Sequence, residues 1–323
     1  MTGNLNGSPE MKVVPIIVGP TGVGKTEISV LLSKYLPVEI ISADSRQIYR
    51  YLDIGTAKPD KKLLMQIPHH FIDALDPSEE FNAGRFEHEA RSVIDQVFER
   101  MRVPLVVGGS GFYINALIDG LPDIVEVGGE VRVDLKKRLA AEGVEKLYEE
   151  LQQVDPDLAR KLAVKDKQRI IRGLEVYYAS GSRLSRMQTR PQRAANFKPM
   201  MIGLTADREV LYGRINRRVD VMLETGLVAE VQKLSNLGLT PDLNALNTVG
   251  YKEVYDYLSG ATTYEEMTEE IKKNSRRYAK RQLTWFRRDK RIQWLEINTP
   301  GDVETTARRI LDIYKNGLSE NVA

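Results

Sequence analysis

Gly19-Pro20-Thr21-Gly22-Val23-Gly24-Lys25-Thr26 is the stretch that decides the fold, and it matches the P-loop pattern Gly-x-x-x-x-Gly-Lys-(Ser/Thr) without a departure. The run 13–18 before it is short, apolar and β-branched, which is typical of a buried parallel strand. The segment 27–35 after it repeats apolar residues at helical spacing. Strand, glycine loop and helix therefore follow one another in the order that a phosphate-binding loop requires.

This loop predicts a phosphate site for a physical reason. Its glycines let the backbone curve so that N–H groups and the helix N-terminus face an anion. Lys25 adds a positive charge, and Thr26 offers a hydroxyl to Mg²⁺. A glycine-rich turn that only starts a helix is the structural alternative, but such a turn needs neither Lys25 nor Thr26.

Composition narrows the class of protein. The 323 residues are 42% apolar and 28% charged, as in ordinary globular proteins, and the net charge is only +2. The absence of cysteine excludes disulfides, thiolate zinc sites and cysteine nucleophiles. Residues 1–10 lack the pattern of a signal peptide, and no apolar run approaches the ~18 residues of a membrane span. We therefore expect a cytoplasmic protein without a membrane partner. We also expect a monomer, although no sequence feature determines how many copies associate.

The order of predicted elements indicates an α/β fold, a P-loop NTPase-like parallel sheet flanked by helices. Further strands are expected at 38–42, 69–73, 104–107, 200–205 and 292–297. Core helices are expected at 81–101, 208–224, 228–237, 264–288 and 303–315, with a further helix that follows residues 247–252 and ends at about residue 258. Between them lie four helical stretches with no strand, at 131–141, 144–153, 157–163 and 168–180. We predict a core domain of residues 11–120 plus 198–323, which includes the basic C-terminal helices, and a small all-helical insertion of residues 121–197.

Asp44 ends the second predicted strand, where it is expected to lie near the phosphate loop because strand ends of an open parallel sheet share one edge. An acid at this place commonly holds Mg²⁺ through water or acts as a general base. Capping of the next turn is the structural alternative. The pair His69-His70 favours a strand entry over a metal site, because no third ligand stands at a recognisable spacing.

Two groups of cations are concentrated late in the chain. Residues 272–291 carry ten Lys and Arg against one acid, Asp289, with aromatic residues between them. Such a stretch favours a phosphate-backbone partner, although a solvated basic face is the structural alternative. Arg214 and Arg218 stand at i and i+4, share a helix face, and could reach a bound phosphate from the side opposite Lys25.

These features allow a nucleotide kinase, an ATPase that acts on nucleic acid, or another transferase of a phosphorylated donor. No Asn-Lys-x-Asp element supports guanine binding, and no strand after the loop ends in the double acid of helicase-type ATPases. An Asp-Asp-x-x-Asp motif is also missing, which argues against a metal-bridged prenyl synthase.

A series of blocks in fixed order gives the chain a more specific likeness. The blocks are 19–26, Ser42-Ala43-Asp44-Ser45-Arg46-Gln47-Ile48-Tyr49, Asp53-Ile54-Gly55-Thr56-Ala57-Lys58-Pro59, His69-His70-Phe71-Ile72-Asp73, Val107-Gly108-Gly109-Ser110-Gly111-Phe112-Tyr113 and Lys280-Arg281-Gln282-Leu283-Thr284-Trp285. Together they resemble the bacterial tRNA dimethylallyltransferases of the IPP transferase family, over about residues 13–288. A chain without cysteine cannot carry the zinc finger of eukaryotic members, which agrees with the bacterial type. Ser110 and Gly111 depart from the expected Thr and bulkier partner, but Ser110 keeps the hydroxyl.

The resemblance implies a reaction and a set of site residues. The enzyme would transfer a dimethylallyl group from dimethylallyl diphosphate to N6 of the adenosine 3′ to the anticodon (position 37), in tRNAs reading codons that begin with U. The products would be N6-isopentenyladenosine and diphosphate. The P-loop, Gly19, Pro20, Thr21, Gly22, Val23, Gly24, Lys25 and Thr26, would bind the diphosphate, with Mg²⁺ at Thr26. Lys25, Thr26 and an arginine, Arg218 in preference to Arg214, would stabilise the leaving group, and Asp44 would be the base.

The same resemblance implies a tRNA interface. Its residues would be Asp44, Ser45, Arg46, Gln47, Ser110, Arg132, Gln168, Arg169, Ile170, Ile171, Arg172, Asn247, Thr248, Val249, Gly250, Tyr251, Lys252 and Arg281. The insertion would grip the anticodon stem-loop, and the long basic helix would follow its backbone. Two other functions stay open on the residues alone: a P-loop kinase of a nucleoside or other small metabolite, which would use the loop for ATP, and a non-enzymatic RNA-binding protein.

Overall fold

The computed structural model describes residues 12–122, 128–189 and 193–319, and the chain divides into two compact units. Within the described residues, unit 1 comprises residues up to Ile118 and from Ala195 onward, and unit 2 comprises Asp119–Ala194. The N-terminal residues that raised the question of a signal peptide lie outside the described residues. No helix in the described part of the chain is long and apolar enough to cross a membrane.

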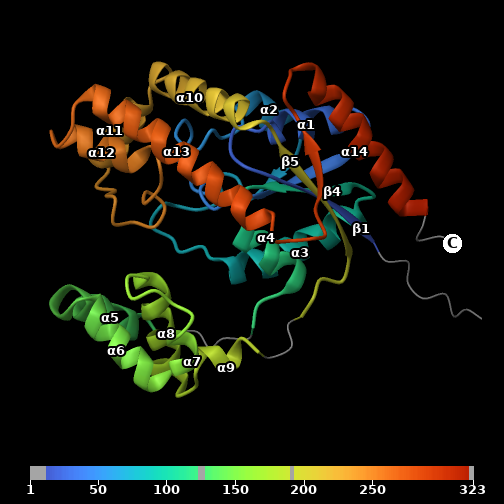
Figure 1. Ribbon diagram of the computed structural model, residues 1–323. Helices are drawn as coiled ribbons and strands as arrows, with labels where there is room; N and C mark the ends of the chain where they lie inside the picture. The colour runs from blue at the N-terminus through green and yellow to red at the C-terminus, as the bar shows by residue number, and fades with distance from the viewer. Residues whose placement is uncertain (1–11, 123–127, 190–192, 320–323) are drawn as a thin grey trace, which may run out of the picture. The chain divides into compact units, whose positions relative to one another are not determined.

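Unit 1 is built on a parallel sheet of six strands in the order β3-β2-β4-β1-β5-β6 (Figure 1). The strands are β1 (Val13–Val18), β2 (Val38–Ala43), β3 (His69–His70), β4 (Val103–Gly108), β5 (Lys198–Thr205) and β6 (Gln293–Glu296). Every residue of β1 and β2 is buried. Helices cover both faces of the sheet, so its central strands can be continuous apolar runs rather than alternating ones.

The helices of unit 1 connect or follow these strands. They are α1 (Lys25–Leu32), α2 (Lys61–Gln66), α3 (Ala83–Glu99), α4 (Gly111–Asp119), α10 (Arg208–Glu224), α11 (Leu227–Asn236), α12 (Tyr251–Leu258), α13 (Tyr264–Phe286) and α14 (Gly301–Ser319). A shared core joins Ile28 and Leu32 of α1, Ile310 of α14 and Ile17 of β1. Thr263 and Glu266 cap α13 reciprocally, which fixes where this long helix begins.

Unit 2 contains α5 (Gly129–Glu142), α6 (Val144–Val154), α7 (Pro156–Ala159), α8 (Lys167–Ser180) and α9 (Leu184–Met187), with no strand among its described residues. Leu147, Leu151 and Leu174 are fully buried in its own hydrophobic core. The buried Asp155 accepts hydrogen bonds from the backbone N–H of Leu158 and from the hydroxyl of Ser185, which ties α7 to α9.

The predicted parallel sheet with flanking helices is confirmed. Three helices were not predicted, α2, α4 and α9, and two of them are shorter than two turns, too short for a periodic pattern. In the observed strand order β4 lies between β1 and β2, so the ends of β1 and β2 are not direct neighbours.

Candidate active site

The P-loop joins β1 to α1 and has the backbone that its sequence predicts. Gly22 and Gly24 have φ of 80° and 108°, a region that side chains other than glycine rarely adopt. Gly24 is the N-cap of α1, so the first N–H groups of this helix have no side-chain cap. An anion can satisfy these N–H groups and lie at the positive end of the helix dipole.

The loop forms one wall of a cavity of about 150 Å³ that gathers residues from most of unit 1. Asp44 lines it from the end of β2, Gly109 from the end of β4, and Arg218 from α10. Tyr278 and Gln282 line it from α13. Other residues that line the cavity include Thr21, Gly22, Gly24, Lys25, Thr26, Gln47, Gly55, Thr56, Ala57, Thr248, Val249 and Gly250. Asp44 therefore shares a cavity with the P-loop although β4 separates their strands.

Lys25 and Arg218 place positive charge against the P-loop in this cavity. The Lys25 ammonium donates to the carbonyls of Gly19 (2.9 Å) and Pro20 (2.8 Å), and Arg218 donates to the Thr21 hydroxyl at 3.3 Å. Burial, and then the charge of Arg218, lower the pKa of Lys25 to about 8, although Asp44 and Glu27 act in the opposite direction. Burial also lowers the pKa of Arg218, whose guanidinium nevertheless stays charged. Two cations held close together in a partly buried site favour a multivalent anion.

Asp44 is held with one carboxylate oxygen engaged and one available. Its Oδ1 accepts hydrogen bonds from the backbone N–H groups of Arg46 (2.9 Å) and Gln47 (3.3 Å). Its Oδ2 accepts none from the described residues. The capping role that the sequence left open is therefore real, and it is compatible with a chemical role for the second oxygen. Ser110 supports this turn, because its hydroxyl accepts from the N–H of Ser45 at 3.1 Å.

The two arginines predicted to share a face of α10 have different surroundings. Arg218 lines the cavity, whereas Arg214 donates to the carbonyls of Ile297 (2.8 Å) and Asn298 (3.2 Å) in the segment after β6. Arg214 is not among the residues that line the cavity. Of the two arginines, Arg218 is therefore the one placed to meet an anion in the cavity, and Arg214 holds the segment after β6.

Gln282 is a cavity residue that the sequence reasoning did not single out. Its side-chain carbonyl accepts from the N–H of Thr21 at 2.8 Å, and its amide donates to the carbonyl of Gly109 at 3.0 Å. One buried side chain from α13 thus joins the P-loop to the loop after β4. The signal was present, since Gln282 lies inside one of the blocks that resemble the family.

A loop of residues 53–57 closes another side of the cavity and is fastened by Glu230 of α11. Glu230 accepts hydrogen bonds from the backbone N–H groups of Asp53 (3.1 Å), Ile54 (2.8 Å) and Gly55 (3.2 Å), and from the Tyr251 hydroxyl at 2.6 Å. Any Cβ at Gly55 would lie 2.4 Å from the ring of Tyr251, so only glycine fits there. No sequence signal identified Glu230, which lies about 175 residues beyond the loop.

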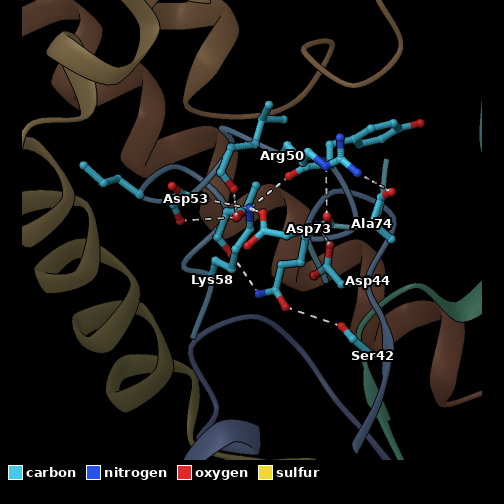
Figure 2. A network of polar contacts seen from close by, with 12 residues as sticks. Ser42, Asp44, Arg50, Asp53, Lys58, Asp73 and Ala74 are labelled. Carbon is cyan, nitrogen blue, oxygen red and sulfur yellow. Dashed lines mark hydrogen bonds and ion pairs between the residues drawn. The ribbon is translucent and has the colours of Figure 1, made fainter. Parts of the chain in front are cut away.

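The other side of the same loop is held by Lys58, whose contacts with Asp53 and Asp73 are drawn in Figure 2, and by Gln47. The buried Lys58 ammonium pairs with Asp53 and Asp73 and donates to the carbonyl of Tyr49. The Gln47 amide donates to the carbonyls of Thr56 (3.1 Å) and Ala57 (3.3 Å). Ala57 has φ of 50°, an unfavourable conformation for alanine, so these contacts hold a strained backbone against the cavity.

A second, wider cavity of about 520 Å³ adjoins the first, with which it shares Arg46, Thr248, Val249 and Tyr278. Burial, and then the nearby Asp44, raise the pKa of Tyr278 to about 12, so its hydroxyl stays protonated near neutral pH. Of the residues predicted to contact RNA, Ser45, Arg46, Asn247, Thr248, Val249, Lys252 and Arg281 line this wider cavity. A polymer that entered it would therefore approach the P-loop.

Several other residues of the predicted RNA interface are buried or ion-paired within the protein. Tyr251 is fully buried against Glu230. In unit 2, Ile170 is fully buried in the core and Ile171 packs against it, so the side chain of Ile170 has no surface to offer. Arg132 and Arg172 both pair with the buried Glu175, while Gln168 and Arg169 are exposed.

The cations of α13 are partly neutralised, contrary to the count from the sequence. Lys272 pairs with Asp220 of α10 and with Glu269, Lys273 pairs with Glu270, and Asp289 pairs with Arg291. Asp220 lies on another helix, Glu269 and Glu270 lie just before the counted stretch, and Asp289 is the one acid within it. The cations without an ion pair among the described residues are Arg276, Arg277, Lys280, Arg281, Arg287, Arg288 and Lys290, so the unpaired charge is concentrated toward the C-terminal part of α13 and the turn after it.

The residues present fit a magnesium ion only together with a phosphate ligand. Thr26 is exposed, lines the cavity, and its hydroxyl has no hydrogen bond among the described residues. The described part of the chain contains no group of three or more His, Cys, Asp or Glu that could hold a metal by itself. His69 and His70 act structurally: His70 bonds to Glu39 at 2.7 Å, and His69 contacts the carbonyl of Ile67.

Comparison with known proteins gives one consistent family. The model of the IPP transferase family matches residues 47–289. A tRNA dimethylallyltransferase of Desulforudis audaxviator is 45% identical over 296 residues, which are 92% of this chain and 96% of that protein. The crystal structure of a full-length tRNA isopentenylpyrophosphate transferase from Bacillus halodurans has a TM-score of 0.71 and 39% identity, covering 97% of this chain and 98% of that one. A eukaryotic dimethylallyltransferase described as acting on tRNA has a TM-score of 0.79 and 29% identity, covering 94% and 80%.

Proposed function

The chain belongs to the IPP transferase family, and from this premise we propose that it is a tRNA dimethylallyltransferase. It transfers a dimethylallyl group from dimethylallyl diphosphate to N6 of the adenosine 3′ to the anticodon, position 37, in tRNAs that read codons beginning with U. The observation that carries the proposal is the single cavity in which the P-loop, Arg218 and Asp44 meet. The cavity holds an anion site and a carboxylate for a nucleophile, as this transfer needs.

The diphosphate of the donor lies in the P-loop, on the N–H groups that begin α1. As the bond between the allylic carbon and the diphosphate oxygen breaks, negative charge develops on the leaving group. Lys25 and Arg218 are already held at this position, so they stabilise the charge without reorganisation. The Thr21 hydroxyl accepts from Arg218 of α10, which holds this arginine against the loop, and Gln282 fixes the loop by accepting from the Thr21 N–H.

The adenine amine is the nucleophile, and its base must leave the stack to enter the cavity. The amine nitrogen forms a bond to the allylic carbon while the carbon–oxygen bond to diphosphate breaks. Asp44 takes one N6 proton on Oδ2, the oxygen that the turn leaves available. Tyr278, whose hydroxyl stays protonated, lines the passage between the wider cavity and the P-loop.

Mg²⁺ is the expected metal, and Thr26 is the protein group that would hold it together with diphosphate oxygens and water. When bound, the ion supplies positive charge to the leaving diphosphate. The basic end of α13, with Arg281, binds the phosphate backbone of the tRNA. Unit 2 binds the anticodon stem-loop through its exposed polar side chains such as Arg169. The alternative of a small-molecule kinase is not favoured by the family match.

The test is transfer of labelled dimethylallyl from its diphosphate to unmodified tRNA in the presence of Mg²⁺. We expect label in tRNAs that read codons beginning with U, and no consumption of ATP. In Asp44→Asn, the amide keeps an acceptor for the turn but cannot take a proton, so turnover falls about 10²–10⁴-fold while tRNA still binds. Absence of incorporation across a set of such tRNAs would refute the proposal, and equal loss of binding and turnover would make Asp44 structural.

A further inference from the structure

Two large aromatic side chains are exposed beside the cavity, and neither the proposed reaction nor the predicted interface uses them. Phe112 at the start of α4 is 55% exposed, and Trp285 near the end of α13 is 40% exposed. Their ring centroids are 6.5 Å apart with an interplanar angle of 81°, an edge-to-face pair. A Cβ at Gly111 would lie 2.2 Å from the Trp285 ring, so the indole rests directly on the backbone at the start of α4.

This pair is tied to the rim of the cavity by the residues one turn away. Gly109 and Gln282 both line the cavity and are hydrogen-bonded to each other. Phe112 follows Gly109 by three residues, and Trp285 follows Gln282 by three residues on the same helix face. The aromatic surface therefore begins within about one helical turn of the site that receives the adenine.

Charges on both sides of Trp285 suit a nucleic acid strand. Arg281 stands four residues before it on the same face of α13. Arg288 follows it by three residues in the turn after the helix, where the Arg288 N–H donates to the Trp285 carbonyl at 3.2 Å. Both are exposed, and neither forms an ion pair with the described residues. Arg281 also lies over the ring of Tyr278 at 5.8 Å. Alternating cations and exposed rings are the arrangement by which single-stranded nucleic acid is bound, phosphates on the cations and bases on the rings.

We propose that Trp285 and Phe112 form a stacking platform for an unpaired tRNA nucleotide that adjoins the reacting adenosine. The inference rests on the proposed function. When the adenine leaves the stack for the cavity, its neighbour loses a stacking partner, and an exposed ring at the rim replaces that partner. The platform accepts any base by its π-face, so it stabilises the extruded loop without reading its sequence.

The protein contains two tryptophans, Trp285 and Trp294, which provides a direct test. In Trp294→Phe the only indole is that of Trp285. Unmodified tRNA, added without the prenyl donor, should quench the emission of Trp285 with the same midpoint as filter binding, because a stacked base quenches an indole. Binding of tRNA with no change in this emission would overturn the proposal. Transfer activity of the same variant shows separately whether the proposed function holds.

A pair of leucine variants distinguishes stacking from packing. Trp285→Leu keeps an apolar group on Gly111 but has no π-face, so the KM for tRNA should rise about 5- to 150-fold. The KM for dimethylallyl diphosphate and the salt dependence of tRNA binding should stay unchanged, since no charge is lost. Tyr35→Leu is the matched control, because Tyr35 is 44% exposed and lies just before β2, at the end of the sheet away from the P-loop. A KM for tRNA in Trp285→Leu equal to that of the control would overturn the platform.

Discussion

Replacing Glu230 by Gln should loosen the loop that closes the active-site cavity while the rest of the fold stays intact. Oε2 accepts from Asp53 and Ile54, and Oε1 accepts from Gly55 and Tyr251. In Glu230→Gln one of these oxygens becomes an NH₂ group. If the NH₂ group replaces Oε1, it faces the N–H of Gly55, and two donors cannot form a hydrogen bond with each other. The remaining hydrogen bonds are weaker because their acceptor no longer carries a negative charge.

The magnitude follows from these contacts. An unsatisfied amide costs about 1–3 kcal/mol, and a hydrogen bond to a charged acceptor exceeds a neutral one by about 1 kcal/mol. Together the two effects amount to about 2–4 kcal/mol. Because Glu230 is only partly buried, we take the lower part of this sum, about 2–3 kcal/mol, for the free energy of opening the loop. At 1.4 kcal/mol per factor of ten, the amides of residues 53–55 should exchange with deuterium about 30- to 150-fold faster.

Hydrogen exchange measured by mass spectrometry tests this prediction, with donor affinity as the functional readout. The KM for dimethylallyl diphosphate should rise, because Gly55, Thr56 and Ala57 line the cavity. Glu224→Gln is the control, an exposed acid at the end of α10 that has no hydrogen bond or ion pair with the described residues. Unchanged exchange at residues 53–55 in Glu230→Gln would refute the assignment of Glu230 as the fastener of this loop.

Three further predictions concern charged groups. Diphosphate binding prefers the charged form of Lys25, whose pKa is about 8. Affinity for inorganic diphosphate, measured by calorimetry, should therefore be level below pH 8 and fall as the pH rises above it. The Lys25→Met variant should show no such fall. Arg218→Gln should lower kcat about 10²–10³-fold with little change in Tm, whereas Arg214→Gln should lower Tm with a small change in kcat; the reverse pattern would exchange their roles. Hydrogen bonding to Arg100 lowers the pKa of the buried Glu39 from 4.5 to about 2. The ionised Glu39 therefore contributes at most about 3 kcal/mol to the free energy of unfolding, a contribution that is present above pH 4.5 and lost as the pH falls through 2. Denaturant unfolding at pH 7 should show that Glu39→Gln is less stable, and equal stability at that pH would contradict this.

The sequence predicted best those features that a local pattern determines. The P-loop needs eight consecutive residues and the glycine conformations that they allow, so the motif was sufficient. The central strands are buried on both faces, and their uninterrupted apolar runs identified them. Asp44 could be placed near the loop because it ends a strand of a parallel sheet, although the intervening β4 was not foreseen.

Features that depend on packing between distant segments could not be predicted from the sequence. In the sequence Glu230 is one acid among several on an amphipathic helix, and its role follows only from the packing of α11 against residues 53–55. Arg214 and Arg218 share a helix face, so the sequence could not distinguish them. Only the fold shows that Arg214 donates to the carbonyls of Ile297 and Asn298, whereas Arg218 lines the cavity. The charge of α13 was overestimated for the same reason, because Asp220 reaches Lys272 from another helix.

The most direct test of the proposed reaction is mass spectrometry of nucleosides from tRNA that has reacted with dimethylallyl diphosphate and Mg²⁺. We expect the adenosine 3′ to the anticodon to gain one dimethylallyl group, as N6-isopentenyladenosine, in tRNAs that read codons beginning with U. We also expect Asp44→Asn nearly to abolish this product. Unmodified adenosine in all such tRNAs, together with phosphoryl transfer from ATP to a small molecule, would contradict it.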